Sequence, residues 1–190
     1  MAIDWLLGTD RHETAADHIY AAAADLIARH GFDHFDIDAV ARRAHCSRAT
    51  VYRHTGGKTR LRETVMARAA TRITAVVDEA VSDRTGADRV HTVLTVAIRE
   101  IRADPVLMAF LESDPGARAV TTFAASPALL DIAADFIGLR DDPVAAAWLI
   151  RTVLSLLLWP ADPDIEAELL RRFTLPILES HPDRNPRPEE

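Results

Sequence analysis

The stretch IDAVARRAHCSRATVYRH, residues 37–54, contains two short helical patterns separated by a tight turn. One face of the first pattern is apolar, and Asp36 precedes it as a cap; the apolar residues are Ile37, Val40, Ala41 and Ala44. Ala44-His45-Cys46 supplies the turn, and Ser47 is a favourable N-cap for a second helix over residues 48–54. Two short helices around a three-residue turn predict a helix-turn-helix.

Helical patterns continue on both sides of this stretch. A first helix is expected from Asp10, whose spacing to Glu13 fits a capping box, to His30 before Gly31. After Gly56-Gly57 the apolar periodicity predicts a long helix, and Asp-Pro pairs recur later as a cap followed by a first-turn proline. The predicted helices cover residues 58–81, 87–102, 105–112, 127–138, 143–159 and 163–179. Pro176 should kink or end the last helix early. No strand pattern is convincing, so the expected fold class is all-α.

Composition narrows the class of protein. Of 190 residues, 48% are hydrophobic and 27% are charged, which favours a globular chain over a disordered one. The N-terminus lacks the features of a secretory signal, and no stretch approaches the roughly 18 apolar residues of a membrane span. With one cysteine, Cys46, an intramolecular disulfide and a thiolate metal cluster are both excluded within one chain. A cytoplasmic protein without membrane association is expected.

Charge is distributed unevenly along the chain. The net charge is −7, yet residues 42–72 hold nine basic residues against one acidic residue, Glu63. This segment therefore carries +8 and the remainder −15. A basic island on an acidic body suits binding to a phosphate backbone. Charge alone is explained equally well by an ordinary solvated, arginine-rich helix.

The residue types between Gly31 and Leu61 indicate the class of protein more specifically than the charge does. An aromatic residue follows a glycine, an apolar-alanine pair lies in the first short helix, and the second short helix has a serine cap and a Val-Tyr pair; the residues are Phe32, Val40-Ala41, Ser47, Val51-Tyr52, and Lys58 followed by Leu61. In these residues the N-terminal third resembles the DNA-binding domain of the tetracycline-repressor (TetR) family. The remaining two-thirds resembles the family in length and helical layout.

The segment also departs from the family pattern. His45 stands where glycine is usual in the turn, so it must adopt a left-handed conformation. Thr55 stands where an aromatic residue is usual, and Gly56-Gly57 loosens the join to the long helix. Phe35 replaces a common hydroxyl residue, which leaves Asp36 to cap the first short helix.

The resemblance implies a division into parts. Residues 1–57 would form a three-helix, helix-turn-helix DNA-binding domain. The long helix would join it to a helical ligand-sensing and dimerisation domain over residues 58–180. The proline-rich, charged tail over residues 181–190 is expected to be disordered.

The second short helix should lie in a major groove of double-stranded DNA. Arg48 and Thr50 are the candidates for reading base edges, because arginine pairs with guanine and threonine bonds a base or meets a thymine methyl. The resemblance implies phosphate contacts for Ser47, Tyr52, His54 and Lys58, and Arg53 suits either task. Structural alternatives stay open: Tyr52 as a packing residue, Ser47 as a cap only and His54 as a solvated side chain.

One recognition helix reads only a few base pairs, so a homodimer and a palindromic operator are expected. The resemblance assigns the dimer contact to the last two helices, with Leu149, Val153, Leu156, Leu169 and Phe173 as candidates. Their periodicity alone fits a protomer core equally well.

The middle helices are expected to enclose a pocket for a small, hydrophobic effector whose identity the sequence does not give. Its candidate lining is His91, Leu94, Ile98, Met108, Leu111, Phe123, Trp148 and Arg151. Most of these residues suit a plain core as well. The resemblance implies a repressor whose operator affinity the effector changes.

No enzyme, cofactor or metal site is predicted. His12-Glu13 and His18 resemble a metalloprotease motif, but the second histidine comes six residues after the first instead of four. No glycine-rich phosphate loop follows a strand. The main alternative to a DNA-binding regulator is an interaction module that keeps the helix-turn-helix shape without specific DNA binding.

Overall fold

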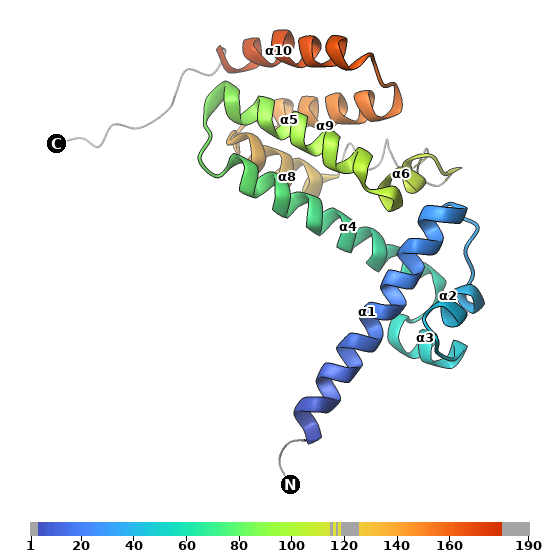
Figure 1. Cartoon of the computed structure of the whole chain (residues 1–190). Coiled ribbons are helices and arrows are strands. Elements are labelled where there is room, and N and C mark those ends of the chain that lie inside the picture. The colour runs from blue at the N-terminus through green and yellow to red at the C-terminus, as the bar shows by residue number, and fades with distance from the viewer. Residues whose placement is uncertain (1–3, 115, 117, 119–125, 180–190) are drawn as a thin grey trace, which may run out of the picture. The chain divides into compact units, whose positions relative to one another are not determined.

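The computed structural model describes the backbone of residues 4–114, 116, 118 and 126–179, and the side chains of residues 15–114, 116, 118 and 126–173. Within them all regular structure is helical (Figure 1), which confirms the all-α prediction. The helices are α1 (Asp4–His30), α2 (Ile37–Arg43), α3 (Arg48–Thr55), α4 (Lys58–Val81), α5 (Gly86–Ala103), α6 (Pro105–Leu111), α8 (Pro127–Ile137), α9 (Pro143–Leu158) and α10 (Pro163–Glu179). The tail over residues 181–190 lies outside the described residues.

One predicted helix boundary is wrong, and Pro176 does not end the last helix early. The first helix begins at Asp4, so Asp10 lies inside it and is not its cap. Once a helix is nucleated, each added residue gains a hydrogen bond, and this carries α1 past a favourable capping residue. The last helix continues through Pro176 to Glu179. A proline removes one backbone donor, but the hydrogen bonds on either side of it can hold the helix.

The Asp-Pro pairs cap helices as predicted. Oδ1 of Asp104 accepts hydrogen bonds from the backbone N–H groups of Val106 and Leu107, at 2.9 and 3.0 Å. Oδ1 of Asp142 does the same for Val144 and Ala145, at 3.0 and 2.9 Å. Each aspartate therefore satisfies two of the orphan donors of a helix start.

The described residues form two compact units. The first takes in Met1–Arg72 and Ala103–Ala117, and the second takes in Ile73–Arg102 and Arg118–Glu190. α4 thus contributes its first part to one unit and its last part to the other. The expected domain boundary at residue 57 coincides with the start of α4, which lies inside the first unit.

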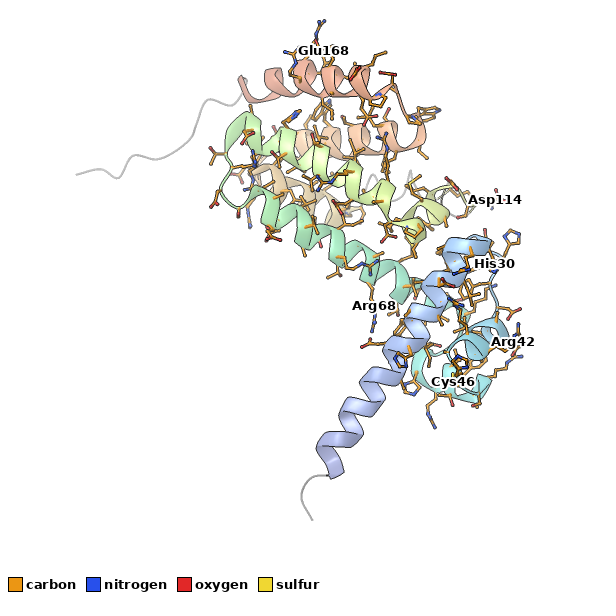
Figure 2. All side chains as sticks on the ribbon, viewed as in Figure 1. His30, Arg42, Cys46, Arg68, Asp114 and Glu168 are labelled. Atoms are coloured by element: carbon orange, nitrogen blue, oxygen red, sulfur yellow. The ribbon has the colours of Figure 1, made fainter. Side chains whose placement is uncertain are left out.

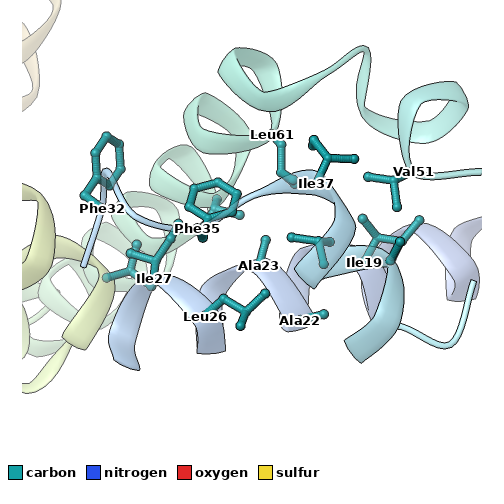
Figure 3. Packing of buried hydrophobic residues seen from close by; sticks show 14 residues of the cluster. Ile19, Ala22, Ala23, Leu26, Ile27, Phe32, Phe35, Ile37, Val51 and Leu61 are labelled. Carbon is teal, nitrogen blue, oxygen red and sulfur yellow. The ribbon is translucent and has the colours of Figure 1, made fainter. Parts of the chain in front are cut away.

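In the first unit, Arg42 points away from α1 into solvent (Figure 2), while the opposite faces of α2 and α3 are buried. Figure 3 shows the core that these faces share with α1, the loop after it and α4. Phe35 is a large side chain at its centre, and Phe32 meets the ring of Phe110 from α6 edge to face, with 5.0 Å between ring centroids. The buried residues include Ile19, Ala23, Ile27, Phe35, Ile37, Val40, Val51, Leu61 and Val65.

In the second unit, Arg89 of α5 binds the C-terminal ends of two other helices. Its Nη1 donates to the carbonyl of Val81 in α4 at 2.7 Å, and its Nε and Nη2 donate to the carbonyls of Phe136 and Asp135 in α8. The last carbonyls of a helix have no partner within the helix. One guanidinium therefore satisfies carbonyls at the ends of both helices, two of them partly buried, and joins these helices to α5.

A second arginine of α5 makes a charged contact with α10. Nη1 and Nη2 of Arg102 bind the two carboxylate oxygens of Glu166 at 2.8 and 2.9 Å, and Nη2 also donates to the carbonyl of Leu156. Glu166 is the only buried charged residue among those described. A bidentate pair of this kind fixes geometry as well as charge.

Replacing Arg89 by alanine should lower the free energy of unfolding by about 1–3 kcal/mol, because partly buried carbonyls lose their donors. Arg99→Ala is the matched control: Arg99 lies on the same helix, and its exposed pair with Glu100 should be worth under about 0.5 kcal/mol. Urea unfolding followed by circular dichroism measures both. Equal losses in the two variants would contradict the role given to Arg89.

Candidate nucleic-acid interface

The turn between α2 and α3 depends on His45. Its φ is +52°, so it adopts the left-handed conformation that the sequence requires of it. The backbone N–H of His45 donates to the carbonyl of Arg42, and that of Cys46 donates to the carbonyl of Ala41 at 3.0 Å. These bonds satisfy carbonyls at the end of α2 and reverse the chain within three residues.

Ser47 caps α3, as predicted. Its Oγ accepts a hydrogen bond from the backbone N–H of Thr50 at 3.1 Å, and it lies 2.9 Å from Oγ1 of Thr50. Both hydroxyl groups therefore take part in the local structure of the helix start. Either can still accept or donate a further bond, since a hydroxyl has one donor and two acceptor positions.

Thr55 explains how α3 ends without the aromatic residue usual in the family. It is buried, and its Oγ1 donates to the carbonyl of Val51 at 2.9 Å and accepts from the backbone N–H of Gly57 at 3.3 Å. Gly56 follows in the left-handed conformation with φ of +72°. Gly57 then has a φ of +110°, a conformation that residues with a Cβ rarely adopt, so glycine suits the passage from α3 to α4.

The exposed face of α3 carries most of the predicted DNA-binding residues. Val51 is 0% exposed and anchors the helix in the core, whereas Tyr52 is 44% exposed. Arg48 and Arg53 are exposed as well, and Thr50 is half-buried. The packing interpretation of Tyr52 therefore accounts for only part of its surface.

Arg48, the first residue of α3, contacts two neighbours. Its Nη1 lies 3.1 Å from Oδ2 and 3.3 Å from Oδ1 of Asp38 on α2. Its Cζ lies 5.6 Å from the centroid of the Tyr52 ring. The Tyr52 hydroxyl and then the Asp38 carboxylate raise the pKa of the Arg48 guanidinium above its ordinary value. These contacts with Asp38 and Tyr52 orient the guanidinium.

Lys58 and His54 are less accessible than Ser47, Arg48, Tyr52 and Arg53. Nζ of Lys58 donates to the carbonyl of Asp33 at 3.3 Å and lies 5.3 Å from the centroid of the Phe35 ring. His54 is half-buried. The Lys58 ammonium thus has a structural contact with the loop after α1, in addition to any role toward phosphate.

The basic island is partly neutralised by aspartates from other parts of the chain. Five of its arginines form ion pairs: Arg43 with Asp25, Arg48 with Asp38, Arg62 with Asp33, Arg68 with Asp17, and Arg72 with Asp104. In the described part of the chain, Arg42, Arg53 and Arg60 are exposed and belong to no ion pair. Arg42 and Arg60 are not among the predicted site residues. Both lie in the basic island, so the charge pattern of the sequence could have indicated them.

Asp38 is a neighbour of the site that sequence reasoning missed. It lies ten residues before Arg48, a spacing that matches neither a helical turn nor a motif. Only the angle between α2 and α3 brings the two side chains together.

The predicted effector pocket is divided between the units. Met108 and Leu111 lie on α6 in the first unit, and the rest of the described candidates lie in the second. There, Leu94 and Ile98 are buried and His91 is half-buried. Phe123 lies outside the described residues.

Trp148 and Arg151 instead line an open groove of about 390 Å³ between α9 and α10, together with several dimer candidates. The groove is lined by Trp148, Arg151, Thr152, Ser155, Leu156, Leu169, Leu170 and Phe173. Of the other dimer candidates, Leu149 is buried and Val153 is half-buried. Leu169 and Phe173 are 39% and 61% exposed.

The described residues contain neither a membrane-spanning helix nor a metal-binding cluster. No helix among them is long and apolar enough to cross a membrane. No group of three or more of their His, Cys, Asp and Glu side chains is arranged to hold a metal ion.

Residues 19–65 match the family described as bacterial regulatory proteins, tetR family. Over 183 residues the chain is 29% identical to each of two uncharacterised HTH-type transcriptional regulators of Mycobacterium tuberculosis, MT1294 of strain CDC 1551 and Rv1255c of strain H37Rv. The alignment covers 92% of this chain and 90% of each relative.

The fold is similar to that of the TetR family repressor AlkX from Dietzia sp. strain DQ12-45-1b, a protein implicated in biodegradation of n-alkanes. The TM-score is 0.55 at 19% identity, covering 86% of this chain and 94% of that one. The matched segment contains α2, the turn at His45 and α3, the elements that form the helix-turn-helix. Residues 19–65 therefore match the tetR family of bacterial regulatory proteins in their helix-turn-helix, and the chain is similar over most of its length to helix-turn-helix transcriptional regulators.

Proposed function

We propose that this regulator is a repressor: it binds a palindromic operator as a homodimer, and a small hydrophobic effector changes its affinity for that operator. The observation that carries the DNA-binding part is the orientation of α3. Val51 is fully buried while Arg48, Tyr52 and Arg53 are exposed on the same helix. A protein that acts on bacterial chromosomal DNA works in the cytoplasm.

Base reading falls chiefly to Arg48. An arginine at the N-terminal end of a recognition helix suits bidentate binding to guanine, and Thr50 lies one half-turn further along. Ser47, Tyr52, Arg53, His54 and Lys58 surround these two and would contact phosphates. The exposed Arg42 and Arg60 add two further phosphate-binding candidates.

The first test is a titration of the purified protein, at several salt concentrations, against DNA fragments that flank its own gene. Arg48→Ala should weaken binding to the preferred fragment by about 5- to 150-fold and flatten the preference for it. Arg53→Ala should weaken binding to all fragments and reduce the slope against log salt concentration by about one. Arg99→Ala, in the second unit, is the control and should change neither.

Weak, sequence-indifferent binding that Arg48→Ala leaves unchanged would contradict specific DNA reading. It would favour the alternative of a protein-interaction module. One observation already points that way, since five of the nine basic residues of the island are neutralised by aspartates.

The homodimer contact is proposed on α9 and α10. Ile165, Leu169 and Phe173 recur every four residues along α10 and are 57%, 39% and 61% exposed. They therefore form one apolar stripe on a helix surface beside the groove that contains Trp148. A second copy is the partner that fits, because two recognition helices are needed for a palindrome.

Replacing Phe173 by glutamate should shift the protein from dimer to monomer at micromolar concentration, because the interface would bury a charge without a partner. Sedimentation velocity measures the change, and operator affinity should fall with it. Val76→Glu places the same charge on an exposed apolar position of α4 and should leave the dimer intact. A Phe173→Glu protein that stays dimeric would move the interface elsewhere.

The effector site is proposed around α5 in the second unit. Leu94 and Ile98 supply apolar surface there, and the half-buried His91 supplies a polar group. A ligand that binds one arrangement of this unit more tightly shifts the population of that arrangement, and α4 shares its residues between both units. Operator affinity that stays constant across a panel of apolar and aromatic ligands would contradict this part of the proposal.

A further inference from the structure

Asp38 places a carboxylate beside the candidate base reader. Its two oxygens lie 3.1 and 3.3 Å from Nη1 of Arg48. Asp38 is the second residue of α2, and Arg48 is the first residue of α3. The contact therefore spans the turn and ties the Arg48 guanidinium to the neighbouring helix.

This pair contributes little to folding. The side chains of Arg48 and Asp38 are 59% and 51% exposed, and ion pairs so close to water add little stability. A carboxylate at this position also repels the phosphates of a bound duplex. A contact that barely stabilises the fold and opposes phosphate binding is best explained by its effect on Arg48.

The geometry leaves Arg48 able to read a base. A guanidinium has five N–H donors in a planar fork, and Asp38 is bound through Nη1. The edge formed by Nε and Nη2 keeps the parallel donors that guanine O6 and N7 accept. The Tyr52 ring, 5.6 Å from Cζ, restricts the guanidinium on a second side. Because the side chain is already oriented, less rotamer entropy is lost on binding a base.

We propose that Asp38 is a specificity-determining residue that holds Arg48 in the orientation that reads guanine. It acts through Arg48 and need not touch the DNA itself. This inference rests on the proposed role of Arg48 as the base reader. In this arrangement Asp38 lowers the affinity for every duplex and raises the preference for guanine at one position of each half-site.

The test is selection of binding sites from a pool of random-sequence DNA duplexes by the full-length protein and its variants. The unaltered protein should enrich sites with a fixed guanine in each half-site. Asp38→Asn should reduce that preference by about fivefold or more, while affinity for unselected duplex stays equal or rises. The double variant Asp38→Asn/Arg48→Ala should show the same base preferences as Arg48→Ala, because Asp38 acts only through Arg48.

Asp17→Asn is the matched control. Asp17 on α1 is also an exposed aspartate paired with an arginine, Arg68 of α4, at 2.7 Å. The change of charge is the same, but the pair does not involve α3. Base preferences should stay those of the unaltered protein, and thermal unfolding of both variants should match it.

Three results would overturn the inference. If Asp38→Asn keeps the base preferences that Arg48→Ala loses, then Arg48 reads its base without help from Asp38. A uniform gain in affinity without a change of preference would leave Asp38 as a source of repulsion only. Failure of the unaltered protein to enrich any sequence would remove the proposed function, and this inference with it.

Discussion

Burial of Val51 is the constraint on which the DNA-binding unit depends. α3 has eight residues, too few to be a stable helix in water by itself, so its conformation comes from packing. Val51 is enclosed in the same core as Ile19 of α1 and Leu61 of α4. Its burial also fixes the rotation of α3 about its own axis, and so determines that Arg48 and Tyr52 face outward. The burial of Val51 thus links the packing of the core to the choice of residues that α3 exposes.

The features that the sequence predicts well are those set within one helical turn. Ser47 and Asp36 bond to backbone N–H groups three residues ahead, and the Asp-Pro caps act over two or three residues. The left-handed turn at His45 follows from the need to reverse the chain in three residues. Each depends only on a residue and its immediate neighbours. For this reason most helix boundaries and the exposed candidates on α3 could be derived without coordinates.

The features that it predicts poorly depend on where separate helices meet. The apolar stripe of α6 has the same periodicity whichever core it enters, so nothing in it showed that Met108 and Leu111 lie in the first unit. Likewise, an arginine on the surface of α5 has no local sign that it binds the carbonyls of Val81 and Phe136. The angle between α2 and α3 brings Asp38 and Arg48 together, and no pattern in the sequence between them predicts this angle.

The charge of residues 42–72 also depends on contacts between separate helices. These contacts change how strongly the proposed site should bind DNA. A sum over residues 42–72 gives +8, but aspartates outside that segment neutralise more than half of its basic residues in space. Sequence-independent binding grows with the number of phosphates that free cations neutralise. Pairing therefore lowers affinity for random DNA, where only exposed residues such as Arg53 and Arg42 contribute fully. Because a genome offers very many random sites, weak background binding raises the fraction of protein on a specific site even when specific affinity is moderate. On the proposed role of Arg48 as the base reader, the orientation of this one arginine matters more for specificity than the size of the basic patch.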